Sequence, residues 1–300
     1  MDIAITGASG LIGTALIPAL ERSGHQVARV VRGGPHDGIS WDPVAGTIDA
    51  TGFEGIGAVI HLAGAGIGDR RWSDKVKRRI LTSRVDGTRL LATTLAGLNR
   101  PPSVFLSGSA IGYYGDRGSE LLSETSAVGT GFLTDVVTAW EAETAPAAAA
   151  GIRTTFLRTG IVLSADGGAL AKLLPLFKLG LGAKMGNGKQ WWSCISLADH
   201  VAMTTWLLEN EVAGPVNITC PEPTTNATFT KTLGQVLERP ARLAVPSFGP
   251  KLVVGAELAE ALLFTSARVE PLAATAAGYQ FAHPTLEDSI RSALAVDSNS

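Results

Sequence analysis

The sequence lacks the features that mark three broad classes of protein. No stretch approaches the ~18 consecutive apolar residues of a membrane-spanning helix, so we expect no membrane partner. Only two cysteines are present, Cys194 and Cys220, too few for a disulfide framework, and we interpret both as ordinary buried thiols. The charges nearly balance, since 25 lysines and arginines stand against 27 aspartates and glutamates. We therefore expect no nucleic-acid partner, because such proteins usually carry a basic stripe.

Signals for export and for metal binding are also missing. Met1 and Asp2 lead directly into the strand-like residues 3–5 without a signal segment, so we expect a cytoplasmic protein. The five histidines are scattered, and no two have the spacing of a metal site, so no metal is expected. His61 lies within an apolar strand pattern, where a hydrogen-bonded core histidine is favoured over a base.

Strands alternate with helices along most of the chain. The composition is globular, with 45% hydrophobic residues among 300. Apolar runs predict strands at 2–6, 25–31, 58–63, 103–107, 153–158 and 214–219. Helical periodicity predicts helices at 11–23, 73–95, 130–150, 196–209, 226–238, 252–264 and 285–294, with Asn226, Thr224 or Thr228 as the cap of the fifth. The pattern indicates an α/β fold with a Rossmann-type doubly wound parallel sheet and a smaller C-terminal substrate lobe.

The alternation loosens after about residue 160, where glycines become frequent. We therefore expect a nucleotide-binding Rossmann domain over 1–160. Residues 161–295 are expected to form mainly a substrate lobe and a C-terminal extension, with some segments returning to the main sheet. Residues 296–300 are polar and are expected to form a tail.

A Gly-x-x-Gly-x-x-Gly motif joins the first strand to the first helix. Gly7 permits a tight turn after Thr6, Gly10 lets the backbone approach a pyrophosphate, and Gly13 allows close packing of helix on strand. The helix N-terminus that follows presents free N–H groups to phosphates. The alternative is a glycine-rich turn with no ligand, but the strand–loop–helix context favours a dinucleotide site.

The end of the second strand favours NADP(H) over NAD(H). NAD-specific sites place a carboxylate there to bind the ribose 2′-hydroxyl. Here the strand ends at Arg32, and no acid follows until Asp37. An arginine can bind a 2′-phosphate with two parallel hydrogen bonds. The alternative interpretation of Arg32 is a solvated surface side chain.

These motifs resemble the short-chain dehydrogenase/reductase superfamily, in particular its extended epimerase/dehydratase branch. Residues 61–64 look like that branch's fourth-strand motif, residues 83–88 like its helix motif, and residues 107–115 like its active-site strand. A narrower resemblance, to SDR39U-type epimerase family proteins with a C-terminal extension domain, covers some 280 residues in order. It rests on residues 112–115, 140–143, 157–163, 179–182, 214–217, 221–226 and 278–287.

The resemblance implies NADP(H) as the cofactor and a homodimer, and it leaves the small-molecule substrate unknown. Carried over position by position, the implied cofactor contacts are Thr6, Gly7, Ser9, Gly10, Leu11, Ile12, Gly13, Arg32, Leu62, Ala63, Gly64, Arg84, Ser107, Ile161 and Val162. The adjacent Trp191 and Trp192 lie where such proteins build their substrate pocket. They either line that pocket or anchor a loop.

The catalytic pattern of the branch is broken. The resemblance implies Tyr-x-x-x-Lys on the helix that contains residues 134–143, but neither residue is there. Ser109 is the candidate for the serine role. The candidates for acid/base work are Tyr113, Tyr114 and Glu141, although packing tyrosines and a glutamate paired with an arginine are the alternatives.

Three functions therefore remain open. The leading hypothesis is an NADP(H)-dependent oxidoreductase or epimerase-like enzyme with an atypical active site. The second is a non-catalytic NADP(H)-binding protein that senses redox state or regulates a partner. The third is a binder of another nucleotide, such as a nucleotide sugar.

Overall fold

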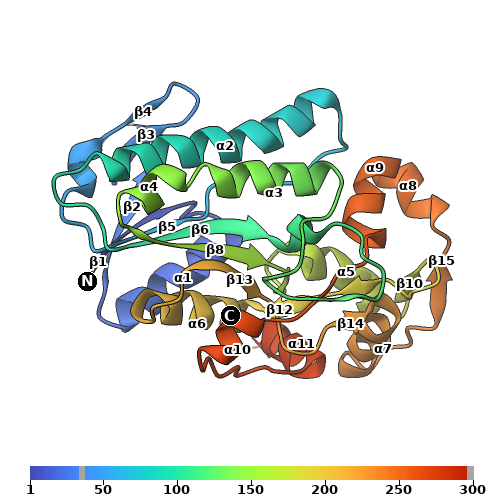
Figure 1. The fold of residues 1–300 in the computed structure, drawn as a ribbon. Coiled ribbons are helices and arrows are strands. Elements are labelled where there is room, and N and C mark those ends of the chain that lie inside the picture. The colour runs from blue at the N-terminus through green and yellow to red at the C-terminus, as the bar shows by residue number, and fades with distance from the viewer. Residues whose placement is uncertain (34–37, 296–300) are drawn as a thin grey trace.

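A single eight-stranded sheet forms the centre of the molecule (Figure 1). The computed structural model describes residues 1–33 and 38–295, so the expected tail at 296–300 and Asp37 lie outside the described residues. Every neighbouring pair in the sheet is parallel except the last, which is antiparallel. The prediction of a Rossmann-type parallel sheet is confirmed. The strand order is β13 (Gly214–Ile218), β8 (Arg153–Thr159), β6 (Val104–Ala110), β5 (Ala58–His61), β1 (Asp2–Thr6), β2 (Gln26–Val31), β3 (Ile39–Asp42) and β4 (Thr47–Ile48).

Helices cover both faces of this sheet, because alternate side chains of each strand point to opposite sides. Ile3, Ile5 and Leu106 pack against α1 (Leu11–Arg22) and α6 (Leu197–Glu209). Ala4 and Phe105 belong to a separate core on the other face, under α2 (Asp74–Ala96) and α4 (Ala145–Ala149). In Figure 1 these two layers lie below and above the sheet, with α3 (Phe132–Ala142) beside α2.

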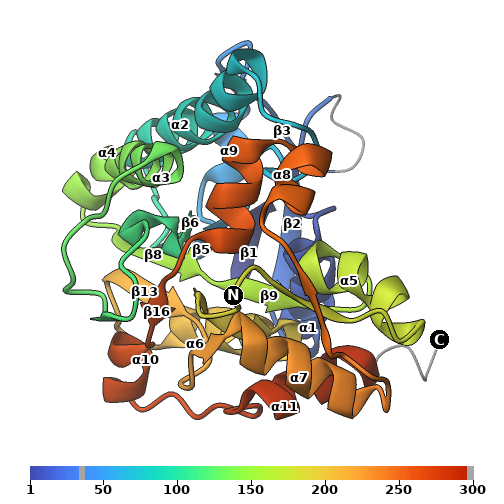
Figure 2. The same ribbon diagram turned by 90° about the vertical axis from the view of Figure 1, so that its right-hand side faces the viewer.

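A smaller lobe lies at the carboxyl ends of the central strands, on the right of Figure 1 and facing the viewer in Figure 2. Its own core includes Leu170, Phe177, Trp192, Phe229 and Ile290. The helices of the lobe are α5 (Gly168–Lys178), α7 (Asn226–Val236), α8 (Phe248–Val254), α9 (Ala256–Ala259), the π-helical η3 (Glu260–Phe264) and α11 (Leu286–Ala295). Its paired strands are β9 (Ile161–Leu163) with β12 (Cys194–Ser196), β10 (Ala183–Met185) with β15 (Leu243–Val245), and β11 (Trp191–Trp192) with β14 (Thr224–Thr225).

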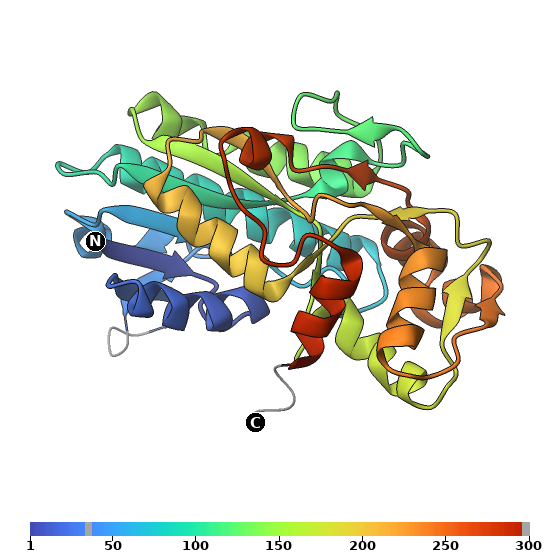
Figure 3. The same ribbon diagram turned by 90° about the horizontal axis from the view of Figure 1, so that it is seen from below.

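The division of the chain at residue 160 stays a prediction. Two elements that follow residue 160 belong with the first part of the chain. β13 lies in the main sheet, and α6 packs beside α1 on one face of that sheet, as the view from below shows (Figure 3). The remaining short elements are η1 (Ala50–Phe53), η2 (Ile111–Tyr114), β7 (Leu121–Leu122), β16 (Arg268–Val269) and α10 (Leu272–Ala276). Within residues 1–33 and 38–295, no helix combines the length and apolar character needed to cross a membrane.

Local chemistry explains where the helices differ from the sequence-based expectation. The helix expected over 130–150 is two helices, and Pro146 lies in the first turn of the second. The helix expected over 252–264 begins earlier and is interrupted at Gly255, whose φ of 98° no right-handed helix tolerates. The cap of α7 is Thr225, which accepts a hydrogen bond from the Thr228 N–H, and not one of the three residues considered. Asn226 instead accepts from the Met185 N–H.

Candidate nucleotide and substrate site

One position in the loop between β1 and α1, and one in the first turn of α1, have room only for glycine. Gly7 has a φ of 71°, and a Cβ atom there would lie 2.7 Å from the carbonyl carbon of Leu62. A Cβ atom at Gly13 would lie 2.4 Å from the carbonyl oxygen of Gly7. Gly13 therefore lets α1 approach the glycine loop itself, not the strand as the motif suggested. The loop is held in a tight, backbone-lined turn.

The first turn of α1 is left open to an anion. Gly10 is its N-cap residue and provides no side-chain cap, and the first turn contains no acidic residue. The N–H groups at the start of a helix have no acceptor within the helix, and the positive end of its dipole lies there. Leu11, Ile12 and Gly13 line a cavity beside this turn, whereas Ser9 is exposed.

Hydrogen bonds of Thr6 and His61 join the carboxyl ends of β1 and β5. The Thr6 hydroxyl oxygen accepts from the N–H groups of Leu62 (3.1 Å) and Ala63 (3.2 Å) and lies 2.6 Å from Nδ1 of His61. Nε2 of His61 lies 3.0 Å from the Thr88 hydroxyl. Burial, with a smaller contribution from the charge of a nearby arginine, lowers the pKa of His61 to about 3. The interpretation of His61 as a core histidine is therefore confirmed.

The two predicted cofactor-binding arginines lie in different environments. Arg32 is exposed and lies two residues beyond Val30, which pairs with Thr6, so it reaches the same sheet edge as the glycine loop. Arg84 is buried, and its Nη1 donates to the carbonyls of Ala65 (3.0 Å) and Ile80 (3.1 Å). Burial lowers the pKa of Arg84 to about 10, so it stays charged at neutral pH.

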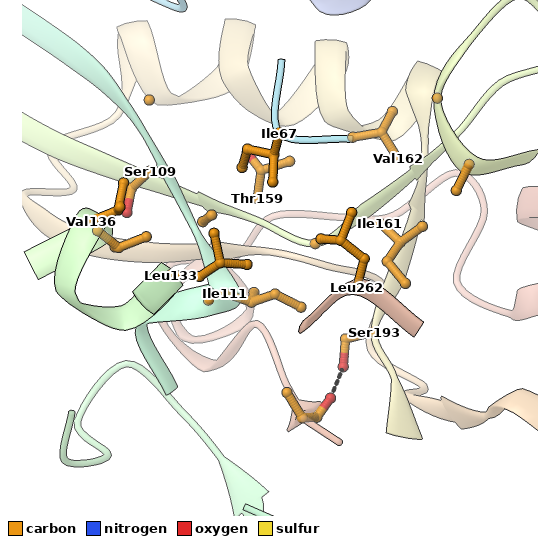
Figure 4. A pocket seen from close by; sticks show the side chains of 18 of the residues that line it. Ile67, Ser109, Ile111, Leu133, Val136, Thr159, Ile161, Val162, Ser193 and Leu262 are labelled. Atoms are coloured by element: carbon orange, nitrogen blue, oxygen red, sulfur yellow. Dashed lines mark hydrogen bonds between the residues drawn. The ribbon is translucent and has the colours of Figure 1, made fainter. Parts of the chain in front are cut away.

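A cavity of about 530 Å³ extends from the glycine loop along the carboxyl ends of the strands. Figure 4 shows Ser109 and Val136 on one side of it and Ile161 and Val162 on the other. Between them lie apolar side chains of different elements, Ile67, Ile111, Leu133 and Leu262. Ten of the predicted site residues line this cavity, namely Gly7, Gly10, Leu11, Ile12, Gly13, Leu62, Arg84, Ser109, Ile161 and Val162.

Other predicted site residues lie around this cavity without lining it. Ala63 and Gly64 follow β5, and a Cβ atom at Gly64 would lie 3.1 Å from the Arg84 guanidinium carbon. Ser107 is buried in β6, with its hydroxyl 3.4 Å from the neighbouring carbonyl of Gly108. The cofactor contacts assigned to these residues stay predictions.

Ser109 is bound to a buried ion pair. Its hydroxyl donates to Oε1 of Glu141 (2.5 Å), and Arg158 donates to both oxygens of the same carboxylate, each at 2.9 Å. Ser109 and Arg158 face each other across β6 and β8, and Glu141 reaches them from α3. The side chains of Arg158 and Glu141 are 4% and 10% exposed. Glu141 is thus the partner of an arginine, the alternative considered for it, and it does not line the cavity.

The two candidate tyrosines pack on the same arginine. Tyr114 is fully buried, its hydroxyl donates to Asn217 Oδ1 (2.7 Å), and it lies 3.2 Å from Nη1 of Arg158. Burial raises the pKa of Tyr114, whereas a catalytic tyrosine needs a lowered one. The guanidinium carbon of Arg158 lies 3.5 Å from the ring centroid of Tyr113. Neither tyrosine lines the cavity, and both pack on Arg158, which is the alternative considered for them.

The face of α3 that borders the cavity bears no titratable group. Its lining residues are Leu133, Val136, Val137 and Trp140. Val136 and Trp140 have the four-residue spacing that the resemblance reserves for Tyr and Lys. Arg158, which joins Glu141 and Ser109 beside the cavity, was not named as a candidate in the sequence analysis, although it lies in the segment 157–163 that carries the family resemblance.

Comparison with known proteins decides the family. The model of the NAD dependent epimerase/dehydratase family matches residues 3–219. The chain belongs to this family. A second model, a domain of unknown function, matches residues 245–293, which contain α8, α9 and η3.

Three relatives are similar to this chain over nearly its whole length. An epimerase family protein of Mycobacterium bovis, Mb2239, is 39% identical over 96% of each chain. The crystal structure of the human epimerase family protein SDR39U1 (isoform 2) with NADPH superposes with a TM-score of 0.90 at 31% identity and covers 100% of both chains. A nucleoside-diphosphate sugar epimerase from Corynebacterium glutamicum gives a TM-score of 0.80 at 34% identity, covering 98% of this chain and 58% of that one.

Proposed function

We propose that this family member binds NADP(H) and uses it in oxidoreductase chemistry on a small molecule. The observation that carries the proposal is the uncapped first turn of α1, set on a glycine loop that opens directly into the cavity at Ser109. A side chain at Gly7 or Gly13 would fill the space between loop and neighbouring backbone. The likeness to a human relative solved with NADPH supports the same cofactor.

Separate residues hold the separate parts of the dinucleotide. The N–H groups of Leu11 and Ile12 bind the pyrophosphate at the helix N-terminus. Arg32, exposed at the same sheet edge, binds the 2′-phosphate. Ile161 and Val162 border the cavity on the side opposite Ser109, where they would pack against the bound cofactor. The cofactor supplies hydride chemistry when bound, and the chain orients it and excludes water.

Ser109 is the group proposed to touch the substrate oxygen. Its proton is directed at Glu141, so its lone pairs are available to a hydroxyl in the cavity. Arg158 donates to both carboxylate oxygens and thereby fixes the position of Glu141 beside Ser109. We assign Glu141 and Arg158 to positioning Ser109, with Tyr113 and Tyr114 supporting the arginine. A homodimer stays a prediction.

A second candidate function is NADP(H) binding without turnover. The observation that favours it is the apolar face of α3, whose cavity-lining residues Leu133, Val136, Val137 and Trp140 include neither a tyrosine nor a lysine. Such a protein would respond to the redox state of the cofactor. Incubation of the protein with NADPH and a panel of carbonyl compounds separates the two functions, because only the enzyme consumes NADPH.

The decisive first experiment is a fluorescence titration with NADPH and, separately, NADH. We expect the chain to bind NADPH more tightly than NADH. The Gly10→Val variant should lose binding, because a side chain there enters the phosphate space, whereas Gly97→Val, at the far end of α2, should bind as the parent does. Unchanged affinity in Gly10→Val would exclude the phosphate-loop role, and failure of the parent to bind either nucleotide would overturn the proposed function.

A further inference from the structure

The described residues that line the cavity include one cation, Arg84, and no acidic residue. Arg84 is only 8% exposed. Burial is the only cause that lowers its pKa, so no described carboxylate lies close enough to offset its charge. The other buried arginine beside the cavity, Arg158, is paired with Glu141 and has a raised pKa. Because an unpaired charge is costly to bury, the position of Arg84 calls for a ligand of opposite charge.

The guanidinium group of Arg84 is held firmly from one side. Its Nη1 donates to the carbonyls of Ala65 and Ile80, as described above. Its central carbon lies 5.1 Å from the centroid of the Trp140 ring. A Cβ atom at Gly64 would lie 3.3 Å from Nη2, so the absence of a side chain there lets the guanidinium lie against the backbone. These contacts fix the orientation of the group before any ligand binds.

The opposite edge of the same guanidinium is free. Nε and Nη2 of Arg84 make no hydrogen bond to any described residue. Neither nitrogen is sealed within the protein, in contrast to Nε1 of Trp140. Since Arg84 lines the cavity, this edge is open to a ligand there.

Arg158 shows what this edge of an arginine binds. Its Nε donates to Oε1 of Glu141 and its Nη2 to Oε2, each at 2.9 Å. Two parallel bonds of this kind match the planar geometry of a carboxylate. Arg84 presents the same pair of donors to the cavity, and no described side chain supplies a carboxylate to them.

The phosphates of the cofactor have other partners in the proposed function. The pyrophosphate lies at the N-terminus of α1, and Arg32 binds the 2′-phosphate. Arg84 belongs to α2, which covers the opposite face of the sheet from α1. It lies against Trp140, whose ring also reaches Gly108, the residue before Ser109, where a Cβ atom would come within 2.9 Å of it. The free edge of Arg84 therefore serves the part of the cavity beside Ser109.

From this open edge we infer that the substrate is a small carboxylic acid, whose carboxylate is held by two parallel hydrogen bonds from Nε and Nη2 of Arg84. The inference rests on the proposed function and names the class of its substrate. The remaining atoms of the acid lie against the apolar side chains of Ile111, Leu133 and Leu262. With a pKa of about 10, the guanidinium of Arg84 is charged at neutral pH, where a carboxylic acid is ionised.

Calorimetric titration of the full chain with hexanoate, in the presence of saturating NADP⁺ and in its absence, tests this site. Hexanamide has the same length and no charge, and it is the comparison ligand. We expect hexanoate to bind under both conditions. Hexanamide should bind about tenfold to a hundredfold more weakly, because it cannot form charge-assisted hydrogen bonds of the same strength.

Two variants of Arg84 and one control locate the site. Arg84→Met removes the guanidinium and should weaken hexanoate binding by about the same tenfold to a hundredfold. Arg84→Lys keeps the charge without the paired donors and should fall between Arg84→Met and the parent. Arg153→Met is the matched control, because Arg153 also donates only to backbone carbonyls and does not line the cavity. It should bind hexanoate as the parent does.

The results separate the inference from the proposed function. Equal affinity of the parent for hexanoate and hexanamide, or unchanged hexanoate affinity in both Arg84 variants, would overturn the carboxylate site. Hexanoate binding that saturating NADP⁺ abolishes would show that the edge of Arg84 takes a phosphate of the cofactor, and the substrate assignment would fall. Failure of the parent to bind NADPH would overturn the proposed function, whereas hexanoate binding that Arg84→Met weakens would still show the carboxylate site.

Discussion

Replacing Arg158 by methionine would remove the cation from a buried ion pair while keeping much of the side-chain volume. The guanidinium donates twice to Glu141 at 2.9 Å and once toward the Tyr114 hydroxyl at 3.2 Å. Without it, a carboxylate that is only 10% exposed keeps Ser109 as its one remaining side-chain donor among the described residues. Removing one partner of such a pair costs about 3–5 kcal/mol.

The assay is urea unfolding followed by circular dichroism for Arg158→Met, Glu141→Leu and the double variant. Each single substitution should lower the free energy of unfolding by about 3–5 kcal/mol, and the double variant by much less than their sum, because no unpaired charge remains. Arg291→Met, which breaks an ion pair whose partners are 59% and 55% exposed, is the matched control and should change stability by no more than about 1 kcal/mol.

The stability that Arg158 contributes to the parent should not vary between about pH 6 and about pH 9. Burial alone lowers the pKa of Arg158, but the hydrogen bonds and charge of Glu141 outweigh it and raise the pKa above its usual value. A cation with a raised native pKa contributes its full stability below its unfolded pKa, and this whole range lies below it. Single variants as stable as the parent, or fully additive effects, would refute the account of a coupled buried pair.

The other predictions concern the cofactor and two buried histidines. Arg32→Ala should lower the ratio of the NADH dissociation constant to the NADPH dissociation constant about tenfold or more, because a charge-assisted hydrogen bond contributes about 1.5–3 kcal/mol. The control is Arg242→Ala, at another exposed arginine. An unchanged ratio in Arg32→Ala would show that Arg32 does not select the cofactor. Burial lowers the pKa of His61 to about 3 and of His200 to about 4, so below the unfolded pKa the unfolded chain binds more protons than the native one. Stability should therefore fall as the pH drops from about 6.5 toward about 4, by up to about 1.4 kcal/mol per pH unit for each histidine, and a flat profile in urea unfolding would contradict both buried neutral states.

The sequence by itself determined the features that depend on local periodicity. The β1–α1–β2 unit, the glycine loop and the order of strands and helices follow from apolar spacing and from glycines that a tight turn requires. Breaks within helices were harder to predict from the sequence. The apolar spacing continues through Gly255, and only the backbone conformation of Gly255 shows that α8 ends there and α9 begins. The N-cap of α7 was also predicted wrongly. Several neighbouring residues have side chains that can cap a helix, and the sequence does not show that Thr225 is the one that does.

The tertiary structure alone decided which polar groups meet. Glu141 could be a base or a partner of an arginine, and only the placement of α3 over the facing Ser109 and Arg158 made it a partner. The tertiary structure also decides the direction of Tyr114. Its hydroxyl donates to Asn217 on β13, 103 residues later in the chain, so the side chain points away from the cavity. Local periodicity specifies the face on which a side chain lies, whereas its partner comes from segments that the chain brings together only when the sheet is assembled.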